Sequence, residues 1–215
     1  MEYAPDRQRK PNPRGAGGEL REEITEAALR LVEATADPSG ITLRGVAREA
    51  GITAPSIYPH FANLDAVMTA VVDRAFDKLH STLEDARAGH DDPVTRLHAL
   101  CRAYASFAVA NPRLYGLLFS QEKVFLLRQV ESGQLAPKPV DTMPGAHTFG
   151  LLVHAVAACV EAGKSTSTDP QRDATLLWTA LHGYVTLLHS TADFPWPPRD
   201  SMLAQYADRL AFLTP

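Results

Sequence analysis

Apolar residues recur every three or four positions along most of this chain, which is the spacing of an amphipathic helix. The first such face consists of Ile24, Ala27, Leu31 and Val32. No stretch has the alternating pattern of a strand, and no segment repeats. The pattern therefore predicts an all-α chain. The expected helices are 19–36, two short ones within 41–61, 63–88, 92–110, 111–119, 122–131, 147–162, 171–190 and 199–213. Asn63 and Asp92 are the expected N-caps of the helices that they begin.

Residues 41–61 combine two short helices with a tight turn, the arrangement of a helix-turn-helix. Thr42 and Thr53 are candidate N-caps, because a threonine hydroxyl accepts a free N–H of the first turn. Gly51 supplies the left-handed residue that ends the first helix. The outward side of the second helix is small and uncharged, and it fits a major groove. An alternative is a purely structural helix pair.

This segment resembles the DNA-binding domain of the TetR family of bacterial transcriptional regulators. The similarity covers about residues 20–75 and rests on Ile41-Thr42, Ala47-Arg48-Glu49-Ala50-Gly51 and Tyr58-Pro59-His60-Phe61. It implies an N-terminal three-helix helix-turn-helix domain followed by a C-terminal helical bundle for ligand binding and dimerisation. The DNA-binding residues that we expect are Thr42, Arg44, Thr53, Ala54, Pro55, Ser56, Tyr58, Pro59 and His60.

Two positions depart from the family's pattern. The family usually has a lysine at the start of the next helix, where it contacts phosphate, and this chain has Leu64 there. We therefore expect DNA binding that is weaker or less dependent on salt than is usual. Pro59 removes one backbone hydrogen bond, so it should tighten the second helix or end it early.

Composition changes between segments and predicts three parts of the chain. Residues 1–18 are rich in Pro, Gly and Arg and are expected to form a disordered basic arm. This arm either follows DNA or is an inert tail. Residues 19–66 are expected to form the DNA-binding domain, and residues 67–215 the ligand-binding and dimerisation domain.

The charge balance gives the DNA interpretation no support of its own. The chain has a formal net charge of −4, and residues 1–62 hold eight Lys and Arg against nine Asp and Glu. Duplex DNA attracts positive surfaces, so this balance argues mildly against binding. The DNA-binding prediction therefore rests on the motif.

The second half of the chain contains aromatic residues at helical spacing. Trp178, His182 and Gly183 resemble the Trp…His-Gly (WHG) signature of one TetR C-terminal subfamily, which implies a domain that responds to a small molecule. An ordinary aromatic core is the alternative. The effector that we expect is small and apolar or aromatic. The candidate ligand-binding residues are Tyr104, Phe107, Phe119, His147, Phe149, Trp178 and His182.

Several classes of function find no support in the sequence. The histidine pairs His147/His154 and His182/His189 are seven residues apart, which is not the spacing of paired metal ligands, so no metal is expected. No nucleophile motif or phosphate loop is present, so we expect neither an enzyme nor a cofactor. Cys101 and Cys159 are expected to be reduced core thiols. With no signal peptide and no spanning segment, the expected location is the cytoplasm, with no membrane contact.

Together these observations predict a ligand-responsive regulator, more specifically a repressor that a small effector releases from a double-stranded DNA operator. One helix-turn-helix contacts little DNA, so a homodimer is expected. The apolar helices 149–162 and 171–190 are the candidate interface. The alternative is a ligand-binding or scaffold protein with weak or lost DNA binding, which Leu64 and the acidic first helix favour.

Overall fold

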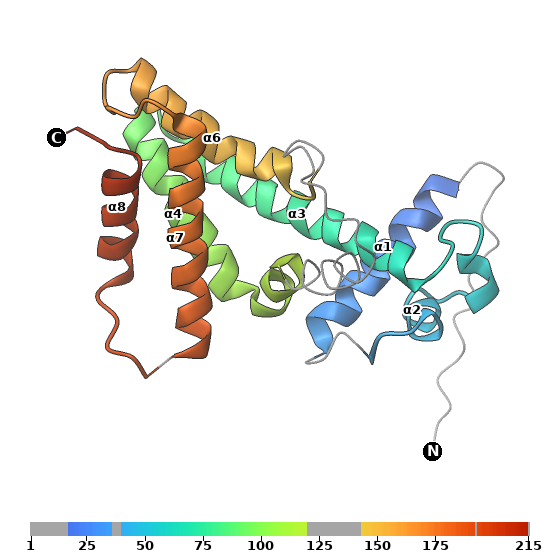
Figure 1. Cartoon of the computed structure of the whole chain (residues 1–215). Helices are drawn as coiled ribbons and strands as arrows, with labels where there is room; N and C mark the ends of the chain where they lie inside the picture. Colours follow the sequence, from blue (N-terminus) through green and yellow to red (C-terminus); the bar gives the residue numbers. More distant parts are fainter. Residues whose placement is uncertain (1–16, 36–39, 120–142, 192, 215) are drawn as a thin grey trace, which may run out of the picture. The chain divides into compact units, whose positions relative to one another are not determined.

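The computed structural model describes residues 17–35, 40–119, 143–191 and 193–214 (Figure 1). Within these residues the chain is all-α, as predicted, and its only extended pairing is an isolated antiparallel bridge between Ser165 and Leu213. The elements are α1 Gly17–Ala34, α2 Leu43–Glu49, the short 3-10 helix η2 Ala54–Ile57, α3 Leu64–Ala88, α4 Pro93–Ala110, a helical stretch at 112–119, α6 Ala146–Glu161, α7 Pro170–Ser190 and α8 Arg199–Leu210.

The chain divides into two compact units, Met1–Arg74 and Ala75–Pro215. The division falls inside α3. The boundary expected from the sequence, between residues 66 and 67, lies earlier in the same helix.

The N-terminal unit is built around a small apolar core. Ile24, Ala28 and Val32 of α1 are fully buried, and so are Val46 of α2 and Ile57 of η2. Burying a side chain of this size stabilises a fold by about 1.5–3 kcal/mol. Neither α2 nor η2 is long enough to be stable alone, so this core holds both in place.

In the C-terminal unit α4 packs against α6, α7 and α8, and α7 packs between α6 and α8 (Figure 1). Two of the helices begin with an aspartate cap. Asp92 accepts a hydrogen bond from the Thr95 backbone N–H at 2.8 Å, and Asp169 accepts one from Arg172 at 3.0 Å. The Asp92 cap was predicted, and it fixes where α4 begins.

The start of α6 depends on a glycine. Gly145 has φ +76°, a conformation that other residues adopt only with strain. A Cβ atom at this position would also overlap the ring of Phe76 from α3. Gly145 therefore permits the close packing of α6 against α3.

Some predicted boundaries were wrong. The first helix begins at Gly17 and ends at Ala34, not at 19 and 36. The last helix ends at Leu210, not at 213, because the chain turns at Phe212 (φ 51°) and brings Leu213 beside Ser165. The predicted arm, apart from its last residues, and the predicted helix 122–131 lie outside the described residues.

Both cysteines, Cys101 and Cys159, are buried free thiols, as predicted. Burial raises the pKa of Cys101 to about 12 and that of Cys159 to about 11, so both stay protonated at neutral pH. Among the described helices, none is both long and apolar enough to cross a membrane.

Candidate nucleic-acid interface and ligand cluster

The first half of the helix-turn-helix forms as its sequence predicts. The Thr42 hydroxyl accepts a hydrogen bond from the Gly45 backbone N–H at 3.1 Å and caps α2. Gly51 has φ +67° and ends the helix after the Ala50 cap. The Ile52 N–H then donates to the Ala47 carbonyl at 2.9 Å, which closes the turn toward η2.

The second half differs from the predicted helix. It is a 3-10 helix of four residues, and its backbone bonds run from residue i to i−3, as in Tyr58 N–H to Pro55 O at 3.3 Å. The physical reason is that Pro59 lacks the N–H that would bond the Pro55 carbonyl in an α-helix, so the Tyr58 N–H takes this acceptor. The prediction that Thr53 caps an α-helix was wrong. Its hydroxyl instead bonds that of Ser56 at 2.8 Å.

Most residues expected at DNA are accessible. Tyr58 is 60% exposed, although its neighbour Ile57 is fully buried. This contrast arises because Ile57 packs into the unit's core while Tyr58 points away from it. Exposed positions in the set are Thr42, Arg44, Thr53, Pro55, Tyr58 and Pro59, and half-buried ones are Ala54, Ser56 and His60.

Arg21 of α1 holds the end of this segment. Its guanidinium lies 4.1 Å from the centre of the Phe61 ring and donates to the His60 carbonyl at 2.6 Å. A cation over an aromatic face adds attraction to the ring's burial. His60 and Phe61 are therefore fixed to α1, and the segment keeps one orientation.

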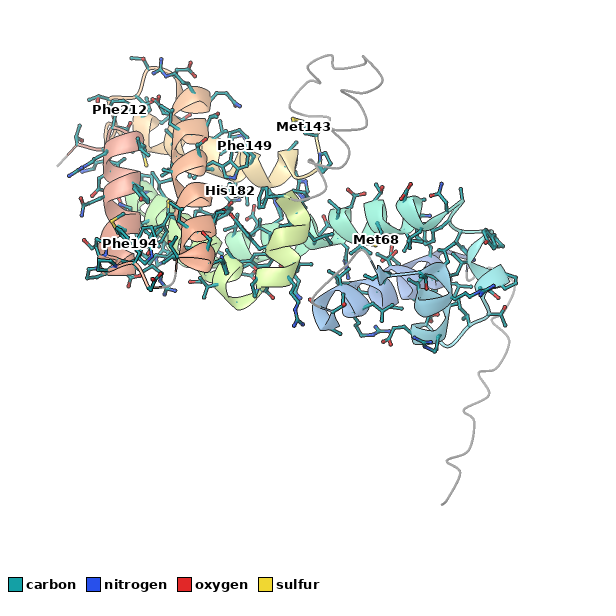
Figure 2. All side chains as sticks on the ribbon, turned by 60° about the horizontal axis from the view of Figure 1, so that its bottom comes forward. Met68, Met143, Phe149, His182, Phe194 and Phe212 are labelled. Atoms are coloured by element: carbon teal, nitrogen blue, oxygen red, sulfur yellow. The ribbon has the colours of Figure 1, made fainter. Side chains whose placement is uncertain are left out.

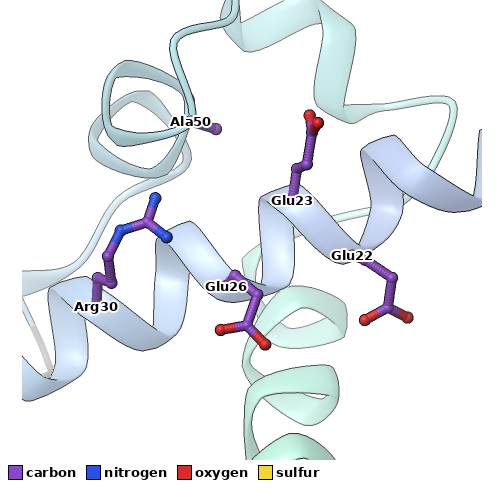
Figure 3. A pocket seen from close by; sticks show the side chains of 5 residues that line it. All are labelled: Glu22, Glu23, Glu26, Arg30 and Ala50. Atoms are coloured by element: carbon purple, nitrogen blue, oxygen red, sulfur yellow. The ribbon is translucent and has the colours of Figure 1, made fainter.

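A shallow hollow of about 270 Å³ lies between α1 and the end of α2, lined by Glu22, Glu23, Glu26, Arg30 and Ala50 (Figure 3). Arginines partly neutralise its acidic side. Arg74 binds Glu26 at 2.7 Å, and Arg30 binds Glu49 at 2.8 Å. Glu26 of α1 thus takes part in a local ion pair of the N-terminal unit.

In the C-terminal unit five of the seven candidate ligand residues come together. Trp178 and His182 of α7 lie 6.0 Å apart between ring centres, and Phe119 lies 6.2 Å and 4.4 Å from them. Phe149 of α6 reaches Trp178 at 6.0 Å, and Figure 2 labels it and His182 where α6 and α7 pack together. Tyr104 joins this group through the hydrogen bonds of its hydroxyl. We call these five residues and Tyr115 the aromatic cluster.

Hydrogen bonds run through this cluster. The Tyr104 and Tyr115 oxygens are 2.9 Å apart, and Tyr115 lies 2.6 Å from Nδ1 of His182. Burial raises the pKa of Tyr104 to about 12 and also raises that of Tyr115, while burial lowers the pKa of His182. All three groups are therefore uncharged at neutral pH.

Two candidates lie apart from the aromatic cluster. His147 is exposed, its ring lies 4.7 Å from that of His80, and its Nε2 lies 3.6 Å from Asp77. Phe107 is buried in α4, and within the described residues no ring contact joins it to the others. Among the described residues no group of three His, Cys, Asp or Glu side chains could hold a metal ion.

Sequence reasoning missed Tyr115, which bonds both Tyr104 and His182. It also missed Phe76 of α3, whose ring lies 6.4 Å from that of Phe119. Tyr115 and Phe119 are four residues apart and so share a helix face, and this spacing could have identified Tyr115. Nothing local to Phe76 distinguishes it from other core positions of α3.

Known proteins are similar to this chain in sequence and fold. An HTH-type transcriptional regulator of Mycobacterium tuberculosis is 26% identical over 136 residues, which are 61% of this chain and 53% of that protein. The chain thus spans about half the length of the curated relatives it matches. A solved structure of a protein of unknown function from Rhodococcus sp. RHA1 is 26% identical, with a TM-score of 0.71 over 94% of this chain and 97% of that one.

A structure of the fatty acid degradation regulator FadR from Bacillus halodurans shows the same fold at 16% identity, with a TM-score of 0.63 over 95% of this chain and 97% of that one. Residues 97–211, more than half of the chain, match the family described as "Tetracyclin repressor-like, C-terminal domain". This match complements the helix-turn-helix found at the other end of the chain. The chain therefore belongs to the TetR family of transcriptional regulators.

Proposed function

We propose that this chain is a DNA-binding transcriptional repressor that a small apolar or aromatic effector releases from its operator. The observation that carries the proposal is the contrast at η2. Tyr58 is 60% exposed, while Ile57 and Phe61 beside it are 0% and 2% exposed. A rigid apolar frame thus presents a polar aromatic side chain to the outside, as a groove-binding element requires.

Tyr58 with Ser56 supplies hydroxyls for hydrogen bonds, and Pro55 and Pro59 supply apolar contact to thymine methyls. Arg44 on α2 is exposed and can donate two hydrogen bonds to a guanine edge. Thr42 and His60 are proposed phosphate contacts, which position the motif without specifying sequence. Thr53 and Ala54 complete the proposed surface.

The proposed effector site is the aromatic cluster, because its side chains converge from α4, α6, α7 and the stretch 112–119. Ligand sites in helical bundles form from such facing helices. An effector releases DNA only if it binds the DNA-free conformation more tightly than the DNA-bound one. His147 and Phe107 lie outside this cluster and are not part of the proposed site.

The proposed active form is a homodimer, because two helix-turn-helix motifs can occupy two half-sites of one operator. Helices α6 and α7 supply the proposed interface. A regulator of this kind works where the chromosome is, so we place the protein in the cytoplasm.

The test is fluorescence anisotropy with a labelled duplex taken from the region upstream of the chain's own gene, or selected from a random library. Tyr58→Ala and Arg44→Ala should each weaken binding about tenfold or more, since one good base contact contributes about 1–3 kcal/mol. Arg102→Ala is the matched control, because Arg102 is an exposed arginine of α4 in the other unit.

If neither substitution changes the affinity for any selected duplex, η2 is not the DNA-binding element. If no duplex is selected at all, the chain is a ligand-binding or scaffold protein instead. A thermal-shift screen tests the effector proposal independently of DNA binding. Only apolar or aromatic compounds should raise the melting temperature of the protein.

A further inference from the structure

Three polar groups inside the aromatic cluster form one hydrogen-bonded chain. Tyr104 bonds Tyr115 at 2.9 Å, and Tyr115 bonds Nδ1 of His182 at 2.6 Å. The direct distance from Tyr104 to His182 Nδ1 is longer, 3.5 Å. Each hydroxyl has a single hydrogen, and a neutral imidazole has a single N–H. The direction of the chain therefore decides which imidazole nitrogen carries the proton.

Only one direction gives every hydrogen an acceptor. If Nδ1 carried the proton, His182 would donate to Tyr115 and Tyr115 to Tyr104. The Tyr104 hydrogen would then lack an acceptor within the described residues, although Tyr104 is only 6% exposed. A buried hydroxyl left unpaired destabilises the fold. In the opposite direction Tyr104 donates to Tyr115, Tyr115 donates to Nδ1, and the imidazole proton lies on Nε2.

The chain is also electrically neutral. Burial lowers the pKa of His182 and raises those of both tyrosines, so none of the three carries a charge near pH 7. The other members of the aromatic cluster, Phe119, Phe149 and Trp178, carry no formal charge either. A charged ligand would lose its hydration here and gain no opposite charge from these six side chains.

We propose that the Nε2–H of His182 is a preset hydrogen-bond donor, and that it binds an uncharged aromatic effector through a carbonyl or ether oxygen. Within the described residues Nε2 makes no hydrogen bond, and the His182 side chain is half-buried. The rings of Phe119, Phe149 and Trp178 are half-buried as well, so they can hold an aromatic ring beside this donor. This inference rests on the proposed effector function and narrows its chemistry.

The first experiment needs no ligand. A long-range ¹H–¹⁵N correlation spectrum of the full chain, with His182 assigned by its loss in His182→Phe, should show the Nε2–H tautomer. In Tyr115→Phe the partner of Nδ1 is removed, so a mixture of tautomers should appear. A His182 protonated on Nδ1, or unaffected by Tyr115→Phe, would overturn the proposal.

The second experiment measures the preference for an acceptor. Trp196→Phe leaves Trp178 as the single tryptophan, so its fluorescence reports binding. The probes are acetophenone, which has a carbonyl, ethylbenzene, which lacks it, and benzoate, which carries a negative charge. Acetophenone should bind about fivefold more tightly than ethylbenzene, the typical effect of one hydrogen bond between neutral groups. Benzoate should bind most weakly.

His182→Phe should abolish the preference for acetophenone while leaving ethylbenzene binding in place. His154→Gln is the matched control, because His154 is an exposed histidine of α6, and it should keep the preference. Tightest binding of benzoate, equal binding of acetophenone and ethylbenzene, or no binding of any probe would each overturn the proposal. DNA affinity is measured separately, so the repressor assignment can hold when this inference fails.

Discussion

Asp173 of α7 is a carboxylate with no exposed surface. The Ser167 hydroxyl donates to it at 2.6 Å, and the Arg172 Nε–H donates at 3.0 Å. Ser167 in turn donates its backbone N–H to the Ser165 hydroxyl, which donates to the Ala211 carbonyl at 2.6 Å. This series of bonds joins the start of α7 to the end of α8.

We predict that Asp173→Asn lowers the free energy of unfolding by about 2 kcal/mol, because the buried amide cannot accept from both donors as a carboxylate does. Chemical denaturation followed by circular dichroism measures this loss. Asp200→Asn, an exposed carboxylate of α8, is the control and should change little. Equal stability of both variants would contradict the role given to Asp173.

The pH dependence follows from the same contacts. Burial alone would raise the pKa of Asp173, but the hydrogen bonds from Ser167 and Arg172 outweigh it and hold the pKa below its ordinary 3.8. Because the folded-state pKa is lowered, the carboxylate stabilises the fold fully above pH 3.8 and loses this effect as the pH falls through the folded value. The difference between wild type and Asp173→Asn should therefore shrink below about pH 4.

Residue-scale predictions from sequence succeeded where the cause is local. Thr42, Asn63 and Asp92 cap their helices because a cap needs only the next three residues. The Thr53 prediction failed because its hydroxyl bonds that of Ser56, and because Pro59 cannot continue the segment as an α-helix. The helical spacing of Tyr115 and Phe119 could have identified Tyr115, but its hydrogen bond to His182 joins residues 67 apart in sequence and could not be predicted locally.

At the scale of elements, α3 begins directly after the proposed DNA-binding segment. Asn63 accepts a hydrogen bond from the Ala66 N–H at 2.9 Å and caps the helix. The other free N–H groups of the first turn form a site that favours phosphate. Leu64 is the first residue of this helix and is half-buried, so the apolar stem of a lysine can replace it.

We predict that Leu64→Lys strengthens operator binding at low salt. One added phosphate contact in each protomer, two per dimer, should make the slope of log K against log salt steeper by about 1.8. Anisotropy titrations over a salt series measure this slope. Val109→Lys adds the same charge at an exposed position of α4 and is the control. A slope that changes equally in both variants would show that position 64 does not contact phosphate.

Element types were predictable because they follow from apolar spacing within one helix. Pro59 was expected to tighten the second helix or end it early, and η2 is a 3-10 helix of four residues. One other feature was not predictable. The packing of α6 against α3 depends on Gly145 and Phe76, which are distant in sequence. The family resemblance supplied the order of the domains, which spacing alone does not give.

For the whole molecule, the two compact units correspond to the proposed DNA-binding and ligand-binding parts of the chain. Large apolar side chains that remain exposed in the single chain indicate where a second copy packs. Leu176 and Leu187 of α7 are 47% and 48% exposed. They are eleven residues apart, which is about three helical turns, so they lie on one side of α7. Gly183 between them adds no side chain that would keep a second helix away.

We predict that this side of α7 packs against the same side of a second copy across a two-fold axis. The double variant Leu176→Glu, Leu187→Glu places four like charges in that interface and should give a monomer by light scattering. Its far-ultraviolet circular dichroism should be unchanged, because both side chains already face outward. Operator affinity should fall about a hundredfold or more, because two linked half-sites bind far more tightly than one.

The control is Val109→Glu, which changes an exposed aliphatic side chain of α4 and should leave the dimer intact. If the double variant stays dimeric, the interface lies elsewhere; if the wild type is itself a monomer at micromolar concentration, each DNA-binding unit binds its half-site alone.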